Sequence, residues 1–377
     1  LGADNGIGIA GALAAFTDEK LVHGPMEALF TVDEETGLTG AYNLGDDMIH
    51  GSILLNLDSE DDAQIFVGCA GGVDTTCVFK YKRSFAPTDF HYFKFDISKG
   101  LGGHSGGDIH LGRANAVQLL ARFLWTLGKE YELSLCEIDG GNLRNAIPRA
   151  AHAVFGVNTA NKEKVVAAFN CYVADVKNEY KDLEPTIEFT LDSVDRPDMA
   201  VDEDTTRRLV DALYSAPHGV ISMSRDIEGL VETSTNLASV KMRPDEEILV
   251  TTSQRSSVES RKWDIAHRVE AVFTLAGAAV THGDGYPGWA PNLNSRIMKI
   301  ASDAYEELYG IKPAVMAIHA GLECGLFLQK YPHLDMASFG PTLQGVHSPS
   351  ERMNIPAVER FWGQLRRTIE KVADLKD

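Results

Sequence analysis

Two short apolar runs near the start of the chain each end in acidic side chains. The run 26–33 leads into the adjacent carboxylates Glu34 and Glu35, and the run 53–57 leads into Asp58. Apolar runs of this length predict buried β-strands. Neighbouring carboxylates repel one another unless a cation lies close to one of them. We therefore expect strands of an α/β sheet whose ends carry a metal site, the alternative being an exposed turn on which Glu34 and Glu35 are solvated charges.

The first residues of the chain predict a turn into a helix. Asp4 and several small residues precede the helix-compatible stretch 8–17, which places Asp4 near a helix N-terminus, where a carboxylate is favourable. Taken alone, Asp4 is a helix cap. In open α/β sheets, however, the ligand crevice lies at the carboxyl ends of the strands. We therefore expect Asp4 to converge with the acidic strand ends on a divalent cation.

A histidine near the other end of the chain favours zinc over magnesium alone. His347 lies in a Pro-containing loop, 345–353, that precedes the helix-like stretch 357–375. Imidazole beside carboxylates is a good ligand set for zinc. The alternative is that His347 is only a solvent-exposed loop residue.

The pattern of elements changes twice along the 377 residues, which indicates one domain inserted in another. Residues 1–71 and 285–377 alternate apolar runs with helix-like stretches, as in an α/β sheet domain. Residues 72–284 instead predict an α+β domain. Its expected helices are 109–129, 161–181 and 257–276, and its expected strands are 131–138, 151–157, 186–192 and 246–254.

Charge and cysteine content exclude some classes of partner. The chain has 35 Lys and Arg against 54 Asp and Glu, a formal net charge of -19, which disfavours a nucleic-acid or anionic-membrane partner. An apolar run long enough to span a membrane is absent from the sequence. The five cysteines contain no Cys-x-x-Cys pair, and we interpret them as reduced thiols of a cytoplasmic protein.

Six short motifs occur in order along the chain. They are LGADNG (1–6), DEETG (33–37), LDSE (57–60), GGHSGG (102–107), LRNAIP (143–148) and VHSP (346–349). Together they resemble the Xaa-His dipeptidases, or aminoacyl-histidine dipeptidases, of the co-catalytic zinc exopeptidase family. The resemblance implies an α/β catalytic domain with a mixed sheet flanked by helices, and an inserted α+β lid and dimerisation domain. It also implies small peptide substrates and a homodimer.

The same resemblance assigns roles at the metal site. It makes Asp4 the carboxylate that bridges two zinc ions, Glu35 and His347 ligands of one ion, and Asp58 a ligand of the other. Glu34 becomes the general base that accepts a proton from the attacking water. This assignment agrees with the local pattern, because a base must lie beside the activated water without being a ligand itself.

Residues of the inserted domain are implied to contact substrate. The resemblance makes His104 a catalytic and substrate-binding histidine, although the glycines around it are also typical of a surface turn. Asn145 and Arg255 match substrate-binding positions, and Arg255 suits a substrate carboxylate. A turn role for Asn145 remains open, and the alternatives to Arg255 are Arg144 and Arg261.

His319 and Glu323 follow the strand-like run 314–318. His319 is either a substrate-pocket residue or a structural histidine, and Glu323 faces either substrate or the solvent of the metal site. The histidines that match no motif, among them His110 and His282, indicate only surface or packing positions.

One departure from the family pattern bears on function. In the family a His-x-Asp segment precedes the first motif and completes the Asp58 metal site, and the start of this chain does not supply it. We therefore expect a further segment upstream in the biological protein. The alternatives to an Xaa-His dipeptidase are an aminoacylase or tripeptidase of the same family, or a catalytically incomplete fragment with a binding role.

Overall fold

The computed structural model describes residues 1–34, 38–346 and 350–375. They form two compact units. The first, here called the α/β unit, comprises Leu1–Gly71, Arg225–Leu230 and Tyr286–Asp377, and the second, the inserted unit, comprises Gly72–Ser224 and Val231–Gly285. The short segment Arg225–Leu230 groups with the α/β unit, whereas the sequence analysis placed it in the inserted domain.

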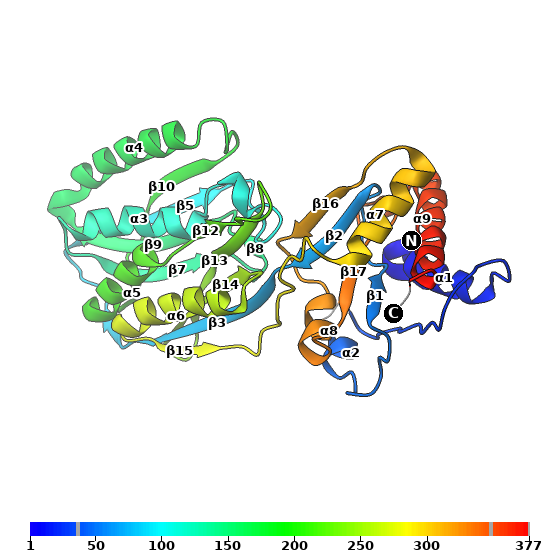
Figure 1. Cartoon of the computed structure of the whole chain (residues 1–377). Coiled ribbons are helices and arrows are strands. Elements are labelled where there is room, and N and C mark those ends of the chain that lie inside the picture. The colour runs from blue at the N-terminus through cyan, green and yellow to red at the C-terminus, as the bar shows by residue number, and fades with distance from the viewer. Residues whose placement is uncertain (35–37, 347–349, 376–377) are drawn as a thin grey trace. The chain divides into compact units, whose positions relative to one another are not determined.

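The α/β unit is built on a four-stranded mixed sheet in the order β1-β17-β2-β16. β1 runs parallel to β17 and β2 parallel to β16, while β17 and β2 are antiparallel. The strands lie side by side in Figure 1. The elements of this unit are α1 (Ala3–Thr17), α2 (Thr39–Tyr42), β1 (Ile53–Asn56), β2 (Gln64–Cys69), α7 (Arg296–Tyr309), β16 (Ala314–Ile318), α8 (Cys324–Lys330), β17 (Asp335–Ser338), β18 (Leu343–Gln344), β19 (Arg352–Met353) and α9 (Ile355–Ala373).

Both faces of this sheet are covered, because successive strand residues point to opposite sides. Ala337 packs into an apolar cluster with residues of α7 and α9, among them Ile297 and Phe361. The preceding residue, Met336, packs on the other face with residues of α8 such as Phe327. The central strands β2 and β17 are accordingly almost fully buried, whereas the edge strands β1 and β16 are only partly buried.

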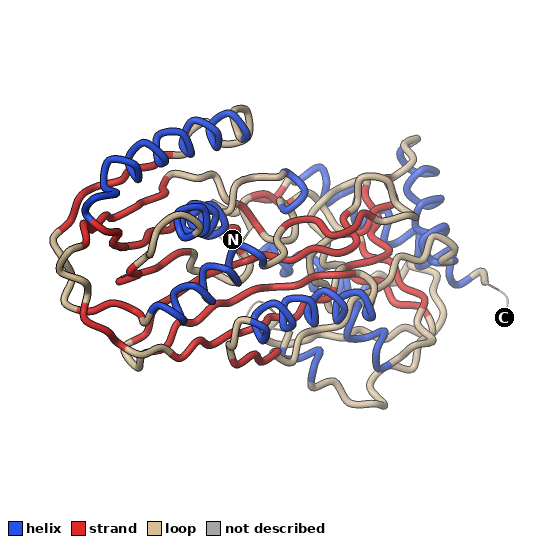
Figure 2. The backbone as a smooth tube through the Cα atoms, turned by 90° about the vertical axis from the view of Figure 1, so that its left-hand side faces the viewer, coloured by secondary structure: helices blue, strands red, loops and turns tan. Residues whose placement is uncertain are grey.

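The inserted unit contains a nine-stranded sheet with the order β10-β5-β9-β7-β13-β14-β3-β15, and β12 pairs with β13. Its strands run beside one another in Figure 2. The elements are β3 (Gly71–Lys80), β4 (Arg83–Phe85), β5 (Phe90–Ser98), β6 (Gly103–His104), η1 (Ile109–Leu111), α3 (Ala116–Gly128), β7 (Ser134–Gly140), β8 (Ala146–Ile147), β9 (Ala151–Asn158), η2 (Thr159–Asn161), α4 (Lys162–Glu179), β10 (Glu188–Val194), β11 (Met199–Val201), α5 (Glu203–Ser215), β12 (Gly219–Met223), β13 (Val231–Arg243), β14 (Glu247–Ser256), α6 (Glu259–Leu275) and β15 (Ala279–His282).

Helices α3, α4, α5 and α6 contribute to one large apolar core with this sheet. Phe123 of α3, for example, packs edge-on against Phe95 of β5, with ring centroids 4.9 Å apart. The helices expected at 161–181 and 257–276 correspond to α4 and α6. All five cysteines are free thiols, as expected.

Two sequence predictions of secondary structure are wrong. The run 26–33 forms no strand; Phe30 is 47% and Val32 is 70% exposed, so the run has no buried face to pack on a sheet. The helix expected over 109–129 begins only at Ala116, because the side chain of Asn115 accepts hydrogen bonds from the backbone N–H groups of the first helical turn and so caps it there.

Among the residues that the structure describes, no helix combines the length and the apolar character needed to cross a bilayer.

Candidate functional site

Asp58 lies two residues beyond the carboxyl end of β1, in a turn held by side chains. The Oγ of Ser338, at the end of β17, donates to Asn56 Oδ1 (2.6 Å), and the backbone N–H of Asp58 donates to the same oxygen (3.2 Å). Ser59 Oγ lies 2.6 Å from Ser338 Oγ. Gly340 packs so closely on the Ser59 carbonyl that a Cβ would overlap it. These contacts fix the position of the backbone that carries the Asp58 side chain.

Asp4 lies in a non-helical turn at the start of α1, and a distant carboxylate holds this turn. Glu351 Oε1 accepts the backbone N–H groups of Ala3 (2.8 Å) and Asp4 (3.0 Å), and Oε2 accepts that of Gly2 (2.7 Å). Three backbone N–H groups thus converge on one carboxylate, and hydrogen bonds to an ionised acceptor are stronger than neutral ones. Glu351 is four residues beyond His347, so it connects the Asp4 turn to the C-terminal loop.

Helix α1 also lies directly against the residue that precedes Asp58. A Cβ on Gly8 would be 2.7 Å from the carbonyl oxygen of Leu57, so this close approach requires glycine. Asp4 and Asp58 therefore belong to adjacent segments of the α/β unit, and their convergence on a cation stays a prediction.

Glu34 does not follow a strand, in contrast to the sequence prediction. Its carbonyl accepts the N–H of Leu38 (2.9 Å), and the Gly40 N–H donates to the Val32 carbonyl (2.9 Å). Thr31 donates from Oγ1 to Glu323 Oε2 (3.0 Å), which connects the segment before Glu34 to the start of α8.

Glu323 is the buried acidic group at the start of α8. Glu323 is only 7% exposed. Burial raises the pKa of its carboxyl, and the hydrogen bond from Thr31 offsets only part of this shift. Oε1 is buried and has no hydrogen-bond partner among the described residues. A buried carboxylate oxygen in this situation favours a bound cation or an N–H donor of a ligand.

Glu323 and Asp58 both affect the pKa of the Cys324 thiol. Burial raises the pKa of the Cys324 thiol, and the neighbouring Cys69, Asp58 and Glu323 raise it further. Asp58 is therefore close enough to act on the same buried group as Glu323. His319, 6% exposed, directly follows β16 and lies only four residues before Glu323.

The expected ligands Glu35 and His347 lie outside the described residues. Asp4, Glu34 and Asp58 do not by themselves make a cluster of three donor atoms for one ion; within residues 1–34, 38–346 and 350–375, only a group in the inserted unit does so. The described part of the expected site thus offers carboxylate oxygens on two adjacent segments and the unpaired Glu323 Oε1. Oxygen donors of this kind fit a divalent cation.

In the inserted unit, β6 and β8 bring His104 and Asn145 together. His104 pairs with Ala146, and the Ser105 N–H donates to the Asn145 carbonyl (2.8 Å). The side chain of Asn145 is exposed, and its backbone carbonyl has the structural role that the turn alternative anticipated.

The ring of His104 has a defined orientation. Its Nδ1 lies 3.2 Å and 3.0 Å from the backbone N–H groups of Gly106 and Gly107. Nδ1 is therefore an acceptor, and the neutral ring carries its hydrogen on Nε2. Burial, and next the positive charge of Arg255, lower the pKa of His104, which favours this neutral form as a hydrogen-bond donor.

The three candidate arginines differ in environment. Arg255 on β14 is 7% exposed and close enough to His104 to affect its pKa. Arg144 pairs with Asp74 at 2.8 Å and Arg261 with Glu232 at 3.3 Å, and both of these arginine side chains are largely exposed. The inserted unit therefore brings Arg255, not its two alternatives, next to His104.

Sequence reasoning gave no role to Glu351. The sequence around Glu351 gives little indication of this role, because the backbone N–H groups that Glu351 binds lie at the other end of the chain. For Glu323, burial was the missing information.

Comparisons with known proteins agree with the motifs. A model of peptidase family M20/M25/M40 matches residues 3–371. The cytosol non-specific dipeptidase of Escherichia coli (strain K12) is 40% identical over 372 residues, which are 99% of this chain and 76% of that protein. The crystal structure of the aminoacylhistidine dipeptidase from Vibrio alginolyticus has 41% identity and a TM-score of 0.92, over 98% of this chain and 76% of that chain.

A more distant structure shares the fold alone. A tripeptidase from Staphylococcus aureus has 15% identity and a TM-score of 0.52, over 99% of this chain and 72% of that chain. The α/β fold class and the resemblance to aminoacyl-histidine dipeptidases are thus confirmed, and the chain belongs to peptidase family M20/M25/M40.

Proposed function

We propose that this protein is a zinc-dependent dipeptidase that hydrolyses Xaa-His dipeptides such as β-Ala-His. One observation carries the proposal: α1, which bears Asp4, packs closely on the residue before Asp58, in a chain that is 41% identical to an aminoacylhistidine dipeptidase. The second relative is named a non-specific dipeptidase, so preference for a C-terminal histidine is the finer part of the proposal.

Asp4 and Asp58, together with Glu35 and His347, would hold two zinc ions. When bound, zinc lowers the pKa of water and polarises a carbonyl oxygen. Glu351 holds the backbone of Asp4, the proposed shared ligand, by accepting its N–H at 3.0 Å.

Glu34 accepts the proton of the attacking water and then delivers it to the leaving amine. Acting first as base and then as acid requires a carboxylate that is not itself a metal ligand. Glu34 meets this requirement in sequence, because its neighbour Glu35 is the proposed ligand.

The inserted unit supplies substrate contacts. His104, neutral and with its hydrogen on Nε2, donates to the oxygen that gains negative charge during attack on the peptide carbonyl. Arg255 binds the substrate carboxylate through paired hydrogen bonds. Asn145 and His319 are further proposed substrate contacts.

Assembly and location are parts of the same proposal. The inserted unit is the proposed lid and dimerisation domain of a homodimer, and the α/β unit is the catalytic domain. A cytosolic location is proposed because the E. coli relative is named a cytosol dipeptidase and the thiols are free.

The proposal is tested by metal content and substrate range of the full-length protein. We expect cleavage of β-Ala-His and other Xaa-His dipeptides, loss of activity after chelation, and recovery with zinc. Matched competitors are Gly-Gly-His for a tripeptidase and N-acetyl-His for an aminoacylase. Cleavage of either competitor without cleavage of the dipeptides, or activity that survives complete removal of metal, would contradict it.

A further inference from the structure

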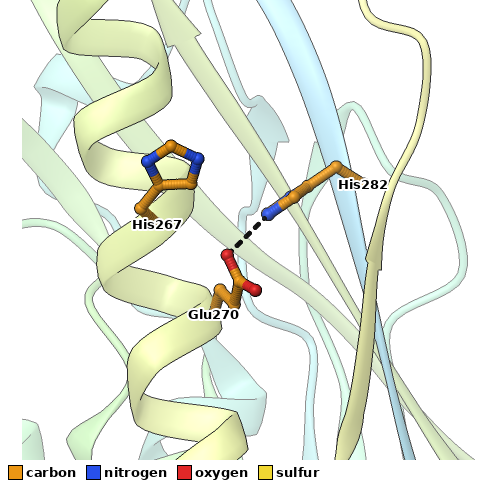
Figure 3. A group of neighbouring side chains, drawn as sticks. All are labelled: His267, Glu270 and His282. Atoms are coloured by element: carbon orange, nitrogen blue, oxygen red, sulfur yellow. Dashed lines mark hydrogen bonds and ion pairs between the residues drawn. The ribbon is translucent and has the colours of Figure 1, made fainter.

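Two histidines and a glutamate that belong to none of the six sequence motifs gather in the inserted unit. His267 and Glu270 are three residues apart on α6, a spacing that places them on one face of the helix, and His282 is the last residue of β15. One nitrogen of each ring and one carboxylate oxygen all lie within 4.8 Å of one another. Figure 3 shows the three side chains between the helix and the strand.

The position of the hydrogen on His282 follows from a buried hydrogen-bond chain behind it. Thr252 donates from Oγ1 to the Thr75 carbonyl (3.5 Å), so Thr252 Oγ1 accepts from Gln254 Nε2 (2.7 Å). This orients the amide so that Gln254 Oε1 accepts from Thr75 Oγ1 (2.7 Å). Thr75 Oγ1 has then used its hydrogen, and it accepts from His282 Nδ1 at 2.9 Å.

Nδ1 of His282 therefore carries a hydrogen, and Nε2 of the neutral ring has a lone pair in its place. That Nε2 lies 3.2 Å from Glu270 Oε2. A lone pair and a carboxylate oxygen repel one another at this distance unless a proton or a metal ion lies between them. The spacing also suits a metal, because donors about 2.1 Å from a tetrahedral zinc ion are about 3.4 Å apart.

A metal-binding histidine commonly donates its other ring N–H to a second group, which fixes the tautomer. Thr75, fully buried and paired with His282 in the sheet, is such a group. His267 is exposed, so its ring can adjust to complete the coordination without disturbing the core.

We propose that His267, Glu270 and His282 bind a divalent transition-metal ion of the zinc class, distinct from the proposed catalytic ions. Two imidazoles and one carboxylate form a three-ligand set that leaves a fourth position to water. The ion joins α6 to β15. The competing arrangement is a metal-free ion pair between a protonated His282 and Glu270.

Trp263 is a local reporter of occupancy. Its ring lies 5.9 Å from that of His267 and 5.7 Å from that of His282, measured between centroids. A paramagnetic ion such as Co²⁺ in this site quenches the fluorescence of a tryptophan so close to it. The variant Trp263→Phe, compared with the native protein, shows how much of the total quenching comes from Trp263.

The test measures bound zinc after dialysis and Co²⁺ quenching in the full-length protein. We expect His267→Ala to lose one equivalent of zinc and the Trp263 part of the quenching, and His267→Cys to restore the zinc. His110→Ala is the matched control, because His110 is an exposed histidine of the same unit outside the cluster. Glu270→Gln is a second variant that removes a ligand and changes little in volume.

Either of two results would overturn the proposal. One is the same zinc content and quenching in the protein with native His267, in His267→Ala and in Glu270→Gln. The other is a native protein in which Co²⁺ leaves the Trp263 fluorescence unchanged. Both results would leave the ion pair as the correct description.

Discussion

The backbone N–H of Asp4 donates a 3.0 Å hydrogen bond to Oε1 of Glu351, 347 residues further along the chain. The same carboxylate accepts the N–H groups of Gly2 and Ala3. Glu351 therefore positions the turn that carries the proposed bridging ligand.

Replacing Glu351 by Gln should weaken metal binding at the proposed catalytic centre. The loss of charge weakens three hydrogen bonds to the Asp4 turn, and changes to groups that position metal ligands typically lower affinity about 10- to 100-fold. Zinc titration measures the effect. Glu359→Gln, at an exposed position of α9, is the control; equal affinities in the two variants would contradict the positioning role.

Replacing His104 by Ala should reduce kcat and leave metal content unchanged. Removal of one donor to a developing oxyanion typically costs about 10²- to 10³-fold. His104→Gln should recover part of this loss, because its amide nitrogen can take the place of Nε2. Steady-state kinetics of both variants, with His110→Ala as control, check the prediction. Unaltered turnover in His104→Ala would remove His104 from the site.

Replacing Arg255 by Lys should raise KM for Xaa-His dipeptides. The planar fork of arginine is lost, and a hydrogen bond to a charged group is worth about 1.5–3 kcal/mol, or about 10- to 150-fold. A dipeptide amide, which lacks the carboxylate, should be little affected. If Arg144→Lys raised KM instead, Arg144 would be the carboxylate-binding residue.

Acidification should destabilise the inserted unit through His218. Its Nδ1 lies 3.3 Å from the Leu237 N–H and from Asn115 Nδ2, and burial lowers its pKa from 6.5 to about 4. The unfolded chain then binds the proton more readily. The His218 contribution to stability is therefore complete above pH 6.5 and is lost as pH falls towards 4, with a slope of at most about 1.4 kcal/mol per pH unit.

The variant His218→Asn isolates this effect. The asparagine oxygen can accept the same hydrogen bonds but does not titrate in this range. Urea unfolding at a series of pH values should give a shallower acid dependence for the variant than for the native protein. Identical slopes would show that His218 does not carry this dependence.

The sequence predicted those elements whose apolar pattern is long or continuous. The expected helix 257–276 corresponds to α6 (Glu259–Leu275), and the run 314–318 is β16. The run 26–33 failed because apolar composition does not specify a partner strand. The helix after residue 109 was misplaced because the local cap at Asn115 outweighs apolar periodicity.

The candidate sites were predictable to a similar degree. Asp58 follows a strand that the sequence predicts, and its place beyond β1 could be foreseen. Glu351 could not be found in this way, since its partners lie at the other end of the chain. His267 and Glu270 have a helical spacing, but only the pairing of β15 with β3 brings His282 to them.

The most direct measurement of the central claim is kcat and metal content of Glu34→Gln in the full-length protein. The account predicts unchanged zinc content and a kcat lower by about 10²- to 10⁴-fold, because the variant loses the base and keeps the ligands. Loss of zinc together with activity, or full activity with the glutamine, would contradict the assignment of Glu34 as the general base of a metallopeptidase.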